Sequence, residues 1–289
     1  MQKVYSVIVT YNPVESVIEE IVYSLFIQKS EVVIVNNSTA DLHLNINNVK
    51  VIELHQNYGL ARAQNVGIQY AITNGADFIL QLDQDSVPSE NMIEQLLLEY
   101  NNLLFKGYKV GQICAWGKDK SLKADYNISG KEIANSVKVF QTMSSGSLFP
   151  KKVFEDIGLM DEKLFIDCVD YEYCWRMNRF GYSVFIARNA RLFCHCGEKI
   201  LKILNVFNIH VNSPLRRYYL FRNVTALTFR NYTPFYWKIS ENCKNCLRIF
   251  VDIFYLDNKR SRFFFSVLGI IHALSGKTGK ISDKWLKIL

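Results

Sequence analysis

The sequence predicts an α/β protein with a mostly parallel, helix-covered sheet and a helical C-terminal extension. Strand-like and helix-like blocks alternate from Val4 to Leu82, as expected when parallel strands are joined by helices. Polar residues follow directly after three of the expected strands. Towards the C-terminus, apolar residues recur at helical spacing among basic residues.

Each expected element follows from its residue pattern. Val4–Thr10 is a β-branched run that Tyr11-Asn12-Pro13 ends, as is typical of a strand. The further strands expected are Val32–Val35, Val49–Leu54 and Phe78–Leu82, the helices are Val14–Gln28, Leu60–Asn74 and Pro88–Tyr100, and a polar turn is expected at Asn36–Thr39. Because the carboxyl ends of parallel strands meet at one edge of a sheet, the chemistry is expected just after these strands.

Composition and charge exclude several classes of protein. Of 289 residues, 49% are hydrophobic and 21% are charged, so the chain is neither disordered nor fibrous. The net charge is +7, and Lys238 to Leu289 contains ten Lys or Arg against four acidic residues, an excess of six. One alternative to an enzyme is a basic nucleotide- or nucleic-acid-binding module without catalysis. Such a module requires a basic stripe across the part of the chain before Lys238, whereas the positive excess lies after it. No nucleic-acid partner is therefore expected.

The chain is expected to remain in the cytoplasm. It contains no apolar stretch of roughly 18 residues or more, and the polar, acidic start from Met1 to Glu20 lacks the pattern of a signal peptide. Seven cysteines without regular spacing indicate reduced thiols.

The segment Asp83-Gln84-Asp85-Ser86 carries the clearest chemical signal. Two carboxylates separated by one residue follow a buried strand, and together they can bind a hard divalent cation, or a cation and a sugar hydroxyl. The alternative is a turn in which Asp caps the next helix. Neither GxGxxG nor a P-loop occurs, which disfavours a nicotinamide enzyme and a P-loop NTPase. Asn57–Gly67 puts small residues and amides at a helix entry, where backbone could approach a flat ligand.

These blocks, in this order, resemble the family 2 glycosyltransferases of GT-A fold, and most closely their bacterial rhamnosyltransferase branch. The matching motifs are Val7–Pro13, Asn57–Gly67, Leu82–Ser86, Ser145–Leu148 and Leu164–Glu172, then Arg176, Gly181, His195, Ser213-Pro214, Arg217-Tyr218-Tyr219 and Arg222-Asn223. The resemblance implies a GT-A glycosyltransferase domain over residues 1–231 and a C-terminal extension over residues 232–289.

Transfer of a sugar from a nucleoside diphosphate leaves negative charge on the β-phosphate, which a divalent cation can neutralise. The resemblance implies Mg²⁺ or Mn²⁺ held by Asp85, with Asp83 on the metal or the ribose and His195 on the metal or the diphosphate. The nucleotide-sugar-binding residues that it implies are Thr10, Tyr11, Asn12, Asn36, Asn57, Gly59, Arg62, Asn65, Asp83, Gly146, Arg217 and Arg222. From the residues alone, His195 could be a core or surface histidine, Gly146 a strand bulge and the two arginines surface charges.

The chain departs from the family at Asn36, where the family usually has an aspartate that accepts the imide N–H of the base. An asparagine oxygen can accept the same hydrogen bond, but without the charge that strengthens it. Base recognition at Asn36 is therefore expected to be weaker.

The acceptor hydroxyl must lose a proton as it attacks, which requires a base. The resemblance puts Asp170 at the position of the catalytic base, with Asp167 and Glu172 binding the acceptor or orienting that base, and it implies inversion of the anomeric configuration. The alternative for these acids is simple capping of a helix.

The tail from Tyr232 onward carries none of the motifs on which the resemblance rests. Glu241–Leu256 and Phe263–Leu274 are apolar at helical spacing and lie beside Lys259, Arg260 and Arg262, which suits an anionic membrane surface. Packing onto the catalytic domain, or a homodimer through these helices, is the alternative.

The sequence therefore predicts a metal-dependent inverting rhamnosyltransferase. It would use dTDP-rhamnose and a lipid-linked saccharide acceptor, in lipopolysaccharide O-antigen or capsule synthesis, peripherally on the cytoplasmic face of the bacterial inner membrane. A UDP-sugar donor on the same fold is the alternative within the enzyme class.

Overall fold

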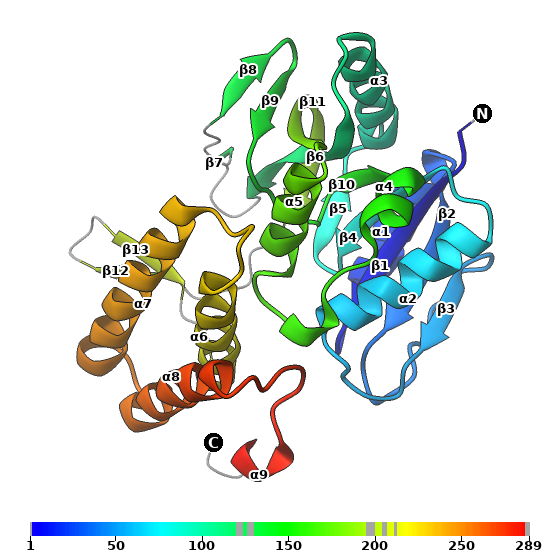
Figure 1. Cartoon of the computed structure of the whole chain (residues 1–289). Coiled ribbons are helices and arrows are strands. Elements are labelled where there is room, and N and C mark those ends of the chain that lie inside the picture. The colour runs from blue at the N-terminus through cyan, green and yellow to red at the C-terminus, as the bar shows by residue number, and fades with distance from the viewer. Residues whose placement is uncertain are drawn as a thin grey trace. The chain divides into compact units, whose positions relative to one another are not determined.

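The computed structural model describes residues 2–119, 124–125, 130–194, 200–203, 207–210 and 213–286. They form two compact units (Figure 1). The first comprises Met1–Asp161 with Tyr173–Cys196, and the second comprises Glu162–Glu172 with Gly197–Leu289. The compact units group residues 197–231 with the C-terminal helices, and the expected domain division after residue 231 stays a prediction.

The first unit contains an 11-stranded sheet with the order β3-β2-β1-β4-β10-β6-β11-β9-β8, with β5 beside β11 and β7 beside β6. Its strands are β1 (Val4–Thr10), β2 (Glu31–Asn36), β3 (Lys50–Glu53), β4 (Phe78–Asp83), β5 (Ser86–Pro88), β6 (Val110–Asp119), β7 (Ala124–Asp125), β8 (Lys131–Ile133), β9 (Ser136–Val139), β10 (Ser147–Pro150) and β11 (Ser183–Cys194). Strands β3, β2, β1 and β4 are mutually parallel, as are β6 and β11, while β10 is antiparallel to both of its neighbours. The expected α/β class with a mostly parallel central sheet is confirmed.

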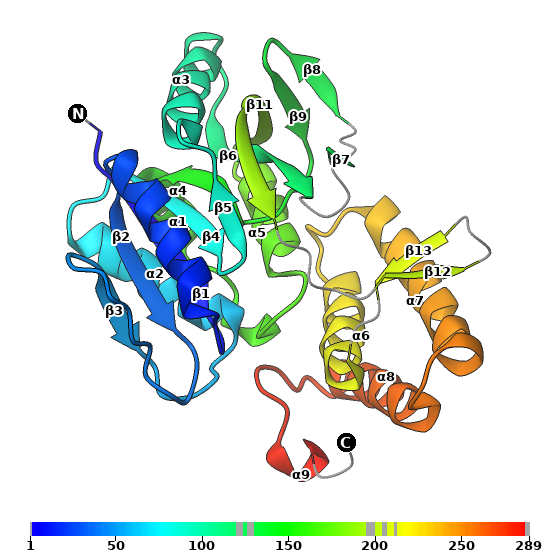
Figure 2. The ribbon, with the colours of Figure 1, turned by 180° about the vertical axis from the view of Figure 1, so that it is seen from behind.

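Helices cover both faces of this sheet, as the opposite views of Figures 1 and 2 show. The helices of the unit are α1 (Glu15–Ile27), α2 (Leu60–Thr73), α3 (Met92–Phe105), α4 (Lys151–Ile157) and α5 (Val169–Arg179), whose first turn belongs to the second unit. On one face, α1 and α3 pack on strand residues such as Ile8 and Leu80 in the main hydrophobic core. On the other face α2 approaches closely at Gly67, where a Cβ atom would come within 2.3 Å of Val7 Cγ1.

The structure confirms most expected elements and corrects both ends of one helix, which was expected over Pro88–Tyr100 and lies at Met92–Phe105. The strand at Val4–Thr10 has the predicted bounds, and the next strands and helices agree to within one or two residues. The helix expected from Pro88 instead begins at Met92, because Ser86–Pro88 forms β5, antiparallel to β11. Proline is tolerated at the end of such a short strand because its missing N–H costs no interior ladder bond.

The second unit is mostly helical. It contains a short 3₁₀ turn (Glu162–Leu164), the hairpin of β12 (Ile200–Ile203) and β13 (Phe207–His210), and the helices α6 (Pro214–Thr228), α7 (Phe235–Tyr255), α8 (Lys259–Leu274) and α9 (Asp283–Leu286). Ser213 caps α6, since its Oγ accepts from the N–H of Arg216 at 3.2 Å. Helices α6 and α8 pack closely at Gly269, where a Cβ would lie 2.6 Å from the carbonyl oxygen of Tyr218. Among the described helices, none has the length and apolar character needed to cross a membrane.

Candidate active site

The carboxyl ends of β1, β2 and β4 lie at one edge of the sheet. Thr10 pairs with Asn36 in the register, and the residue before Thr10 pairs with Asp83. Thr10 Oγ1 donates to Asn36 Oδ1 at 3.2 Å, and the N–H of Asn12 donates to Ser38 Oγ at 2.8 Å. The structure thus brings together four of the expected donor-site residues at the place where parallel sheets bind ligands.

The side chain of Asn36 is buried, and every hydrogen-bonding position on it is in use. Its Oδ1 accepts from Thr10 Oγ1 and from the N–H of Ser38, both at 3.2 Å. Its Nδ2 donates to the carbonyl oxygen of Ala40 at 2.8 Å and to Glu53 Oε2 at 2.6 Å. An amide has two donors and two lone pairs on its oxygen. Recognition of a base by Asn36 stays a prediction, and it requires one of these bonds to be displaced.

Glu53 explains the departure from aspartate at position 36. A carboxylate there would lie against the carboxylate of Glu53, and like charges at hydrogen-bonding distance repel strongly. The Asn36 amide donates to Glu53 instead, and the other Glu53 oxygen accepts from the N–H of Leu42 at 3.0 Å. Sequence reasoning missed Glu53 because its partner lies on a neighbouring strand, 17 positions away.

Gln84, between the two aspartates, holds the main chain of Tyr11. The N–H of Tyr11 donates to Gln84 Oε1 at 2.7 Å, and Gln84 Nε2 donates back to the carbonyl oxygen of Tyr11 at 3.3 Å. The Tyr11 side chain remains 50% exposed. An exposed ring at this edge is suited to stacking on a nucleobase.

Side-chain amides shape the entry to α2. Asn37 Nδ2 donates to Asn57 Oδ1 at 3.1 Å, and Asn37 Oδ1 accepts from the N–H of Tyr58 at 2.8 Å. Asn57 Oδ1 also accepts from the N–H of Gly59 at 2.9 Å. Gly59 has φ of +90°, which few other residues adopt. Arg62 is exposed and stacks on the Tyr58 ring at 4.4 Å. Asn57 and Gly59 therefore shape the loop, and Arg62 presents a cation at its surface.

Two further expected donor-site residues have clear local roles. Asn65 is buried and exchanges two hydrogen bonds with the backbone of Met160, at 3.0 and 2.9 Å. Gly146 has φ of +75°, and a Cβ there would lie 2.7 Å from Leu192 Cδ2. Backbone conformation and packing thus account for this glycine, which directly precedes β10. Nucleotide-sugar binding by Asn65 and Gly146 stays a prediction.

Two serines hold the Asp83–Asp85 loop. Ser145 Oγ accepts from the N–H of Asp83 at 3.0 Å and donates to Ser86 Oγ at 3.1 Å. Ser86 Oγ lies 3.4 Å from Asp85 Oδ1 and can donate to it. Asp85 is exposed and Asp83 partly so. Two accessible carboxylates fit Mg²⁺ or Mn²⁺, which take oxygen ligands and keep positions for water or phosphate oxygens. In the described ranges, no group of three or more His, Cys, Asp or Glu side chains is placed so that it could hold a metal ion.

The expected third metal ligand, His195, lies outside the described residues. The described part of β11 ends at Cys194, which pairs with Ser86 in the register. The Ser86 hydroxyl lies 3.7 Å from Cys194 Sγ. The end of β11 is therefore beside the loop that carries Asp85.

The acidic segment that leads into α5 belongs to the second unit. Asp167 Oδ1 accepts from Arg216 Nε at 3.2 Å. Glu172 is buried, and its Oε1 accepts from Tyr232 Oη at 2.6 Å and from Arg230 Nη1 at 3.2 Å. Burial, and then the hydrogen bond to Glu172, raise the pKa of Tyr232 to about 12. Asp170 is partly exposed in the first turn of α5. One of its carboxylate oxygens, Oδ1, is buried, and its role as the catalytic base stays a prediction.

Arg217 and Arg222 lie in the interior of the second unit. Arg217 is 1% exposed, and its Nη2 donates to Asp252 Oδ1 at 3.0 Å. Burial lowers the pKa of Arg217 more than Asp252 raises it. Arg222 is 2% exposed and donates to carbonyl oxygens, including that of Leu164 at 2.8 Å. The alternative of surface charges is therefore wrong for both arginines. Contact of either guanidinium with a diphosphate stays a prediction.

Comparison with known proteins gives a consistent result. The model of the family described as glycosyl transferase family 2 matches residues 6–157. The dTDP-rhamnosyl transferase RfbF of Shigella flexneri is 33% identical over 290 residues, which cover 96% of this chain and 97% of that protein. The solved structure of residues 1–349 of S. aureus TarS has a TM-score of 0.59 at 14% identity, over 94% of this chain and 81% of that one. GalNAc-T7 with UDP, GalNAc and Mn²⁺ also gives 0.59 at 14% identity, over 95% and 56%. These structures support the expected GT-A fold.

Proposed function

Because the chain belongs to glycosyl transferase family 2 and is therefore a glycosyltransferase, we propose that it transfers L-rhamnose from dTDP-rhamnose to a lipid-linked saccharide. Such a reaction would serve bacterial O-antigen or capsule synthesis. The observation that carries the donor assignment is the 33% identity, along 96% of the chain, to a dTDP-rhamnosyl transferase.

The edge formed by β1, β2 and β4 is the proposed nucleotide site. The exposed Tyr11 ring would stack on thymine, and Arg62 would supply a positive charge near the phosphates. Thr10, Asn12, Asn57 and Gly59 would shape the loops around it. Measuring the dissociation constants of dTDP and UDP by calorimetry tests this site: preference for dTDP supports the proposed donor, and preference for UDP favours the alternative.

Asp83 and Asp85 are the proposed ligands of Mg²⁺ or Mn²⁺, with His195 as a third. When bound, the cation supplies positive charge that meets the charge growing on the β-phosphate as the sugar leaves. Support comes from the exposed carboxylate of Asp85 and from Ser86 and Ser145, which hold the loop. Loss of Mn²⁺ binding by calorimetry in Asp85→Ala, with an unchanged circular dichroism spectrum, would support the assignment independently of activity.

Asp170 is the proposed general base. In this role its carboxylate takes the proton of the acceptor hydroxyl as the hydroxyl attacks the anomeric carbon. A single displacement with one base inverts the anomeric configuration. Support comes from the partial exposure of Asp170, while its neighbour Glu172 is buried against Tyr232 and Arg230. Asp167 would then orient the acceptor.

We also propose that the second unit attaches the enzyme to the cytoplasmic face of the bacterial inner membrane, where a lipid-linked acceptor would lie. One face of α7 carries five apolar side chains that are each more than half exposed: Tyr236, Ile239, Leu247, Phe250 and Phe254. Their spacing puts them on one side of the helix, over five turns. An exposed apolar stripe of this kind is typical of a helix that lies in a membrane surface.

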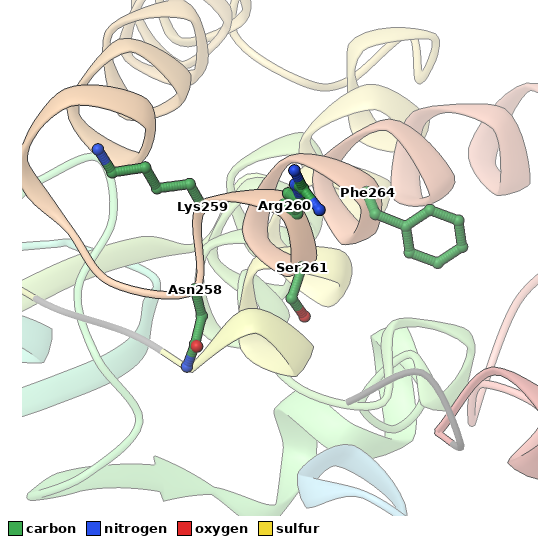
Figure 3. A pocket seen from close by; sticks show the side chains of 5 residues that line it. All are labelled: Asn258, Lys259, Arg260, Ser261 and Phe264. Atoms are coloured by element: carbon green, nitrogen blue, oxygen red, sulfur yellow. The ribbon is translucent and has the colours of Figure 1, made fainter.

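Charge selects an anionic lipid surface as the partner for this stripe. The segment from Lys238 has an excess of six positive charges. Where α7 gives way to α8, a pocket of about 720 Å³ is lined by Asn258, Lys259, Arg260, Ser261 and Phe264 (Figure 3). Two basic side chains and an aromatic ring among the lining residues suit a lipid headgroup with its adjoining chain. Binding to vesicles of phosphatidylglycerol, but not phosphatidylcholine, would support this partner, and a salt-independent dimer would favour a second copy instead.

A further inference from the structure

The loop that precedes Asp170 has an unusual backbone. Three non-glycine residues in it have positive φ: Phe165 at +65°, Asp167 at +64° and Cys168 at +63°. Side chains disfavour this left-handed region, so such a run persists only where its surroundings hold it. The loop leads directly into the first turn of α5, which carries Asp170. Whatever holds the loop therefore also sets the position of this carboxylate.

Two adjacent side chains of α6 hold it. Asn223 is 1% exposed, and its Nδ2 lies within hydrogen-bonding distance of three carbonyl oxygens: those of Leu164 at 3.0 Å, Ile166 at 2.7 Å and Asp167 at 2.9 Å. Arg222 Nη2 donates to the carbonyl oxygens of Leu164 at 2.8 Å and Lys163 at 3.2 Å. Its Nε and Nη2 also donate to Asn223 Oδ1, at 3.0 and 2.9 Å, which fixes the amide.

The same helix supports the loop through an aromatic contact. The ring of Tyr219 stacks on that of Phe165, with centroids 4.7 Å apart and an interplanar angle of 14°. Tyr219 Oη accepts from the N–H of Ile281 at 3.1 Å, and Arg222 Nη1 bonds the carbonyl oxygen of Gly279. The loop is therefore fixed between α6 and the segment before α9.

We propose that Arg222 and Asn223 are positioning residues for the acidic loop and do not bind the donor diphosphate. Their N–H groups bond the carbonyl oxygens of Lys163, Leu164, Ile166 and Asp167. These bonds hold the loop whose residues Phe165, Asp167 and Cys168 are left-handed, so that Asp167 and Asp170 present their carboxylates in a fixed direction. The inference rests on the proposed function for its effect on turnover, since Asp170 is the proposed base. The effect on the loop itself does not depend on that assignment.

The test compares Asn223→Ala, Asn223→Asp and Arg222→Lys with Thr225→Ala, a control on the same helix. A lysine cannot reproduce the fork of the guanidinium, and an aspartate replaces the amide donor by an acceptor that faces carbonyl oxygens. Misplacement of a reacting group by about 1 Å can cost roughly a hundredfold in rate. We expect kcat to fall by about that factor, with the donor KM and the dTDP dissociation constant within twofold of wild type. The control should match wild type.

Hydrogen exchange provides the second measurement. It separates a local change in the loop from a general loss of stability, because a general loss would also speed exchange in α7. In the three variants, amides of residues 164–169 should exchange at least tenfold faster, while those of α7 keep their wild-type rates. Wild-type exchange in this loop, or dTDP binding weakened more than tenfold with kcat unchanged, would overturn the proposal. The three variants could show fast exchange and lost turnover while a separate Asp170→Asn variant is fully active. That result would retain the positioning role of Arg222 and Asn223 and reject Asp170 as the base.

Discussion

The buried ion pair between α6 and α7 leads to a prediction about stability. Arg217 Nη2 and Asp252 Oδ1 are 3.0 Å apart, and both side chains are 2% exposed. Arg262 Nη1 of α8 lies 3.9 Å from the same oxygen. The carboxylate of Asp252 thus faces two buried guanidinium groups from two other helices. Without it, neither guanidinium would have this negative charge to balance its own.

The distances give the size of the expected effect. With an effective dielectric constant of about 20, the two attractions amount to roughly 5 and 4 kcal/mol before desolvation and the repulsion between the arginines are subtracted. Removing one partner of a buried pair costs about 3–5 kcal/mol. Asp252→Asn keeps the shape of the side chain, so nearly all of its effect should come from the lost charge. We expect the free energy of unfolding of the second unit to fall by about that amount.

Urea unfolding followed by tryptophan fluorescence measures this change. Trp237 and Trp285 lie in the second unit, so a background with Trp116→Phe and Trp175→Phe reports on that unit alone. The matched control is Asp283→Asn, which breaks an exposed pair with Lys280 at 3.8 Å and should cost less than about 1 kcal/mol. Equal small effects in both variants would refute the argument that burial makes the Asp252 charge decisive.

Four further predictions follow. Asp85→Ala should lose most donor turnover and its response to added Mn²⁺; full activity in excess chelator would reject the metal. Asp170→Asn should lower kcat by roughly a hundredfold or more with dTDP binding unchanged by calorimetry, and a near-normal kcat would remove it as the base. Burial, then nearby Lys277, lowers the pKa of His272, so the folded protein favours the neutral imidazole. The free energy of unfolding is therefore highest above pH 6.5 and falls as the pH drops below it, and His272→Gln should flatten the dependence of melting temperature on pH. Phe250→Ser with Phe254→Ser should weaken binding to phosphatidylglycerol vesicles at least tenfold, and unaltered binding in sedimentation would exclude the α7 stripe.

Local sequence patterns predicted the parallel strands of the sheet well and missed the short strand β5. Val4–Thr10 and Phe78–Asp83 are β-branched or apolar runs with clear ends, and burial on both faces produces such runs in parallel strands. Ser86–Pro88 gave no comparable signal, because β5 exists through its pairing with β11, more than 100 residues later. Pairings of this range depend on the folded chain and leave no periodic pattern in sequence.

The candidate site shows the same difference. The residues after β1 and β4 could be predicted as site residues because chain order alone puts them at the carboxyl edge. The partners that orient them could not be predicted: Glu53 contacts Asn36 from the neighbouring strand, and Gln84 binds main-chain atoms of Tyr11. The charge of Arg222 at a matching motif is visible in the sequence, whereas the burial of its side chain is not.

We expect this enzyme to transfer rhamnose from dTDP-rhamnose. The most direct test of this expectation is mass spectrometry of the products formed from a panel of nucleotide sugars with a lipid-linked saccharide acceptor and Mg²⁺, in parallel with the Asp170→Asn enzyme. We expect one deoxyhexose to be added to the acceptor from dTDP-rhamnose alone, with dTDP released and little product from the variant. Efficient transfer of a hexose or N-acetylhexosamine from a UDP-sugar, with none from dTDP-rhamnose, would contradict this expectation.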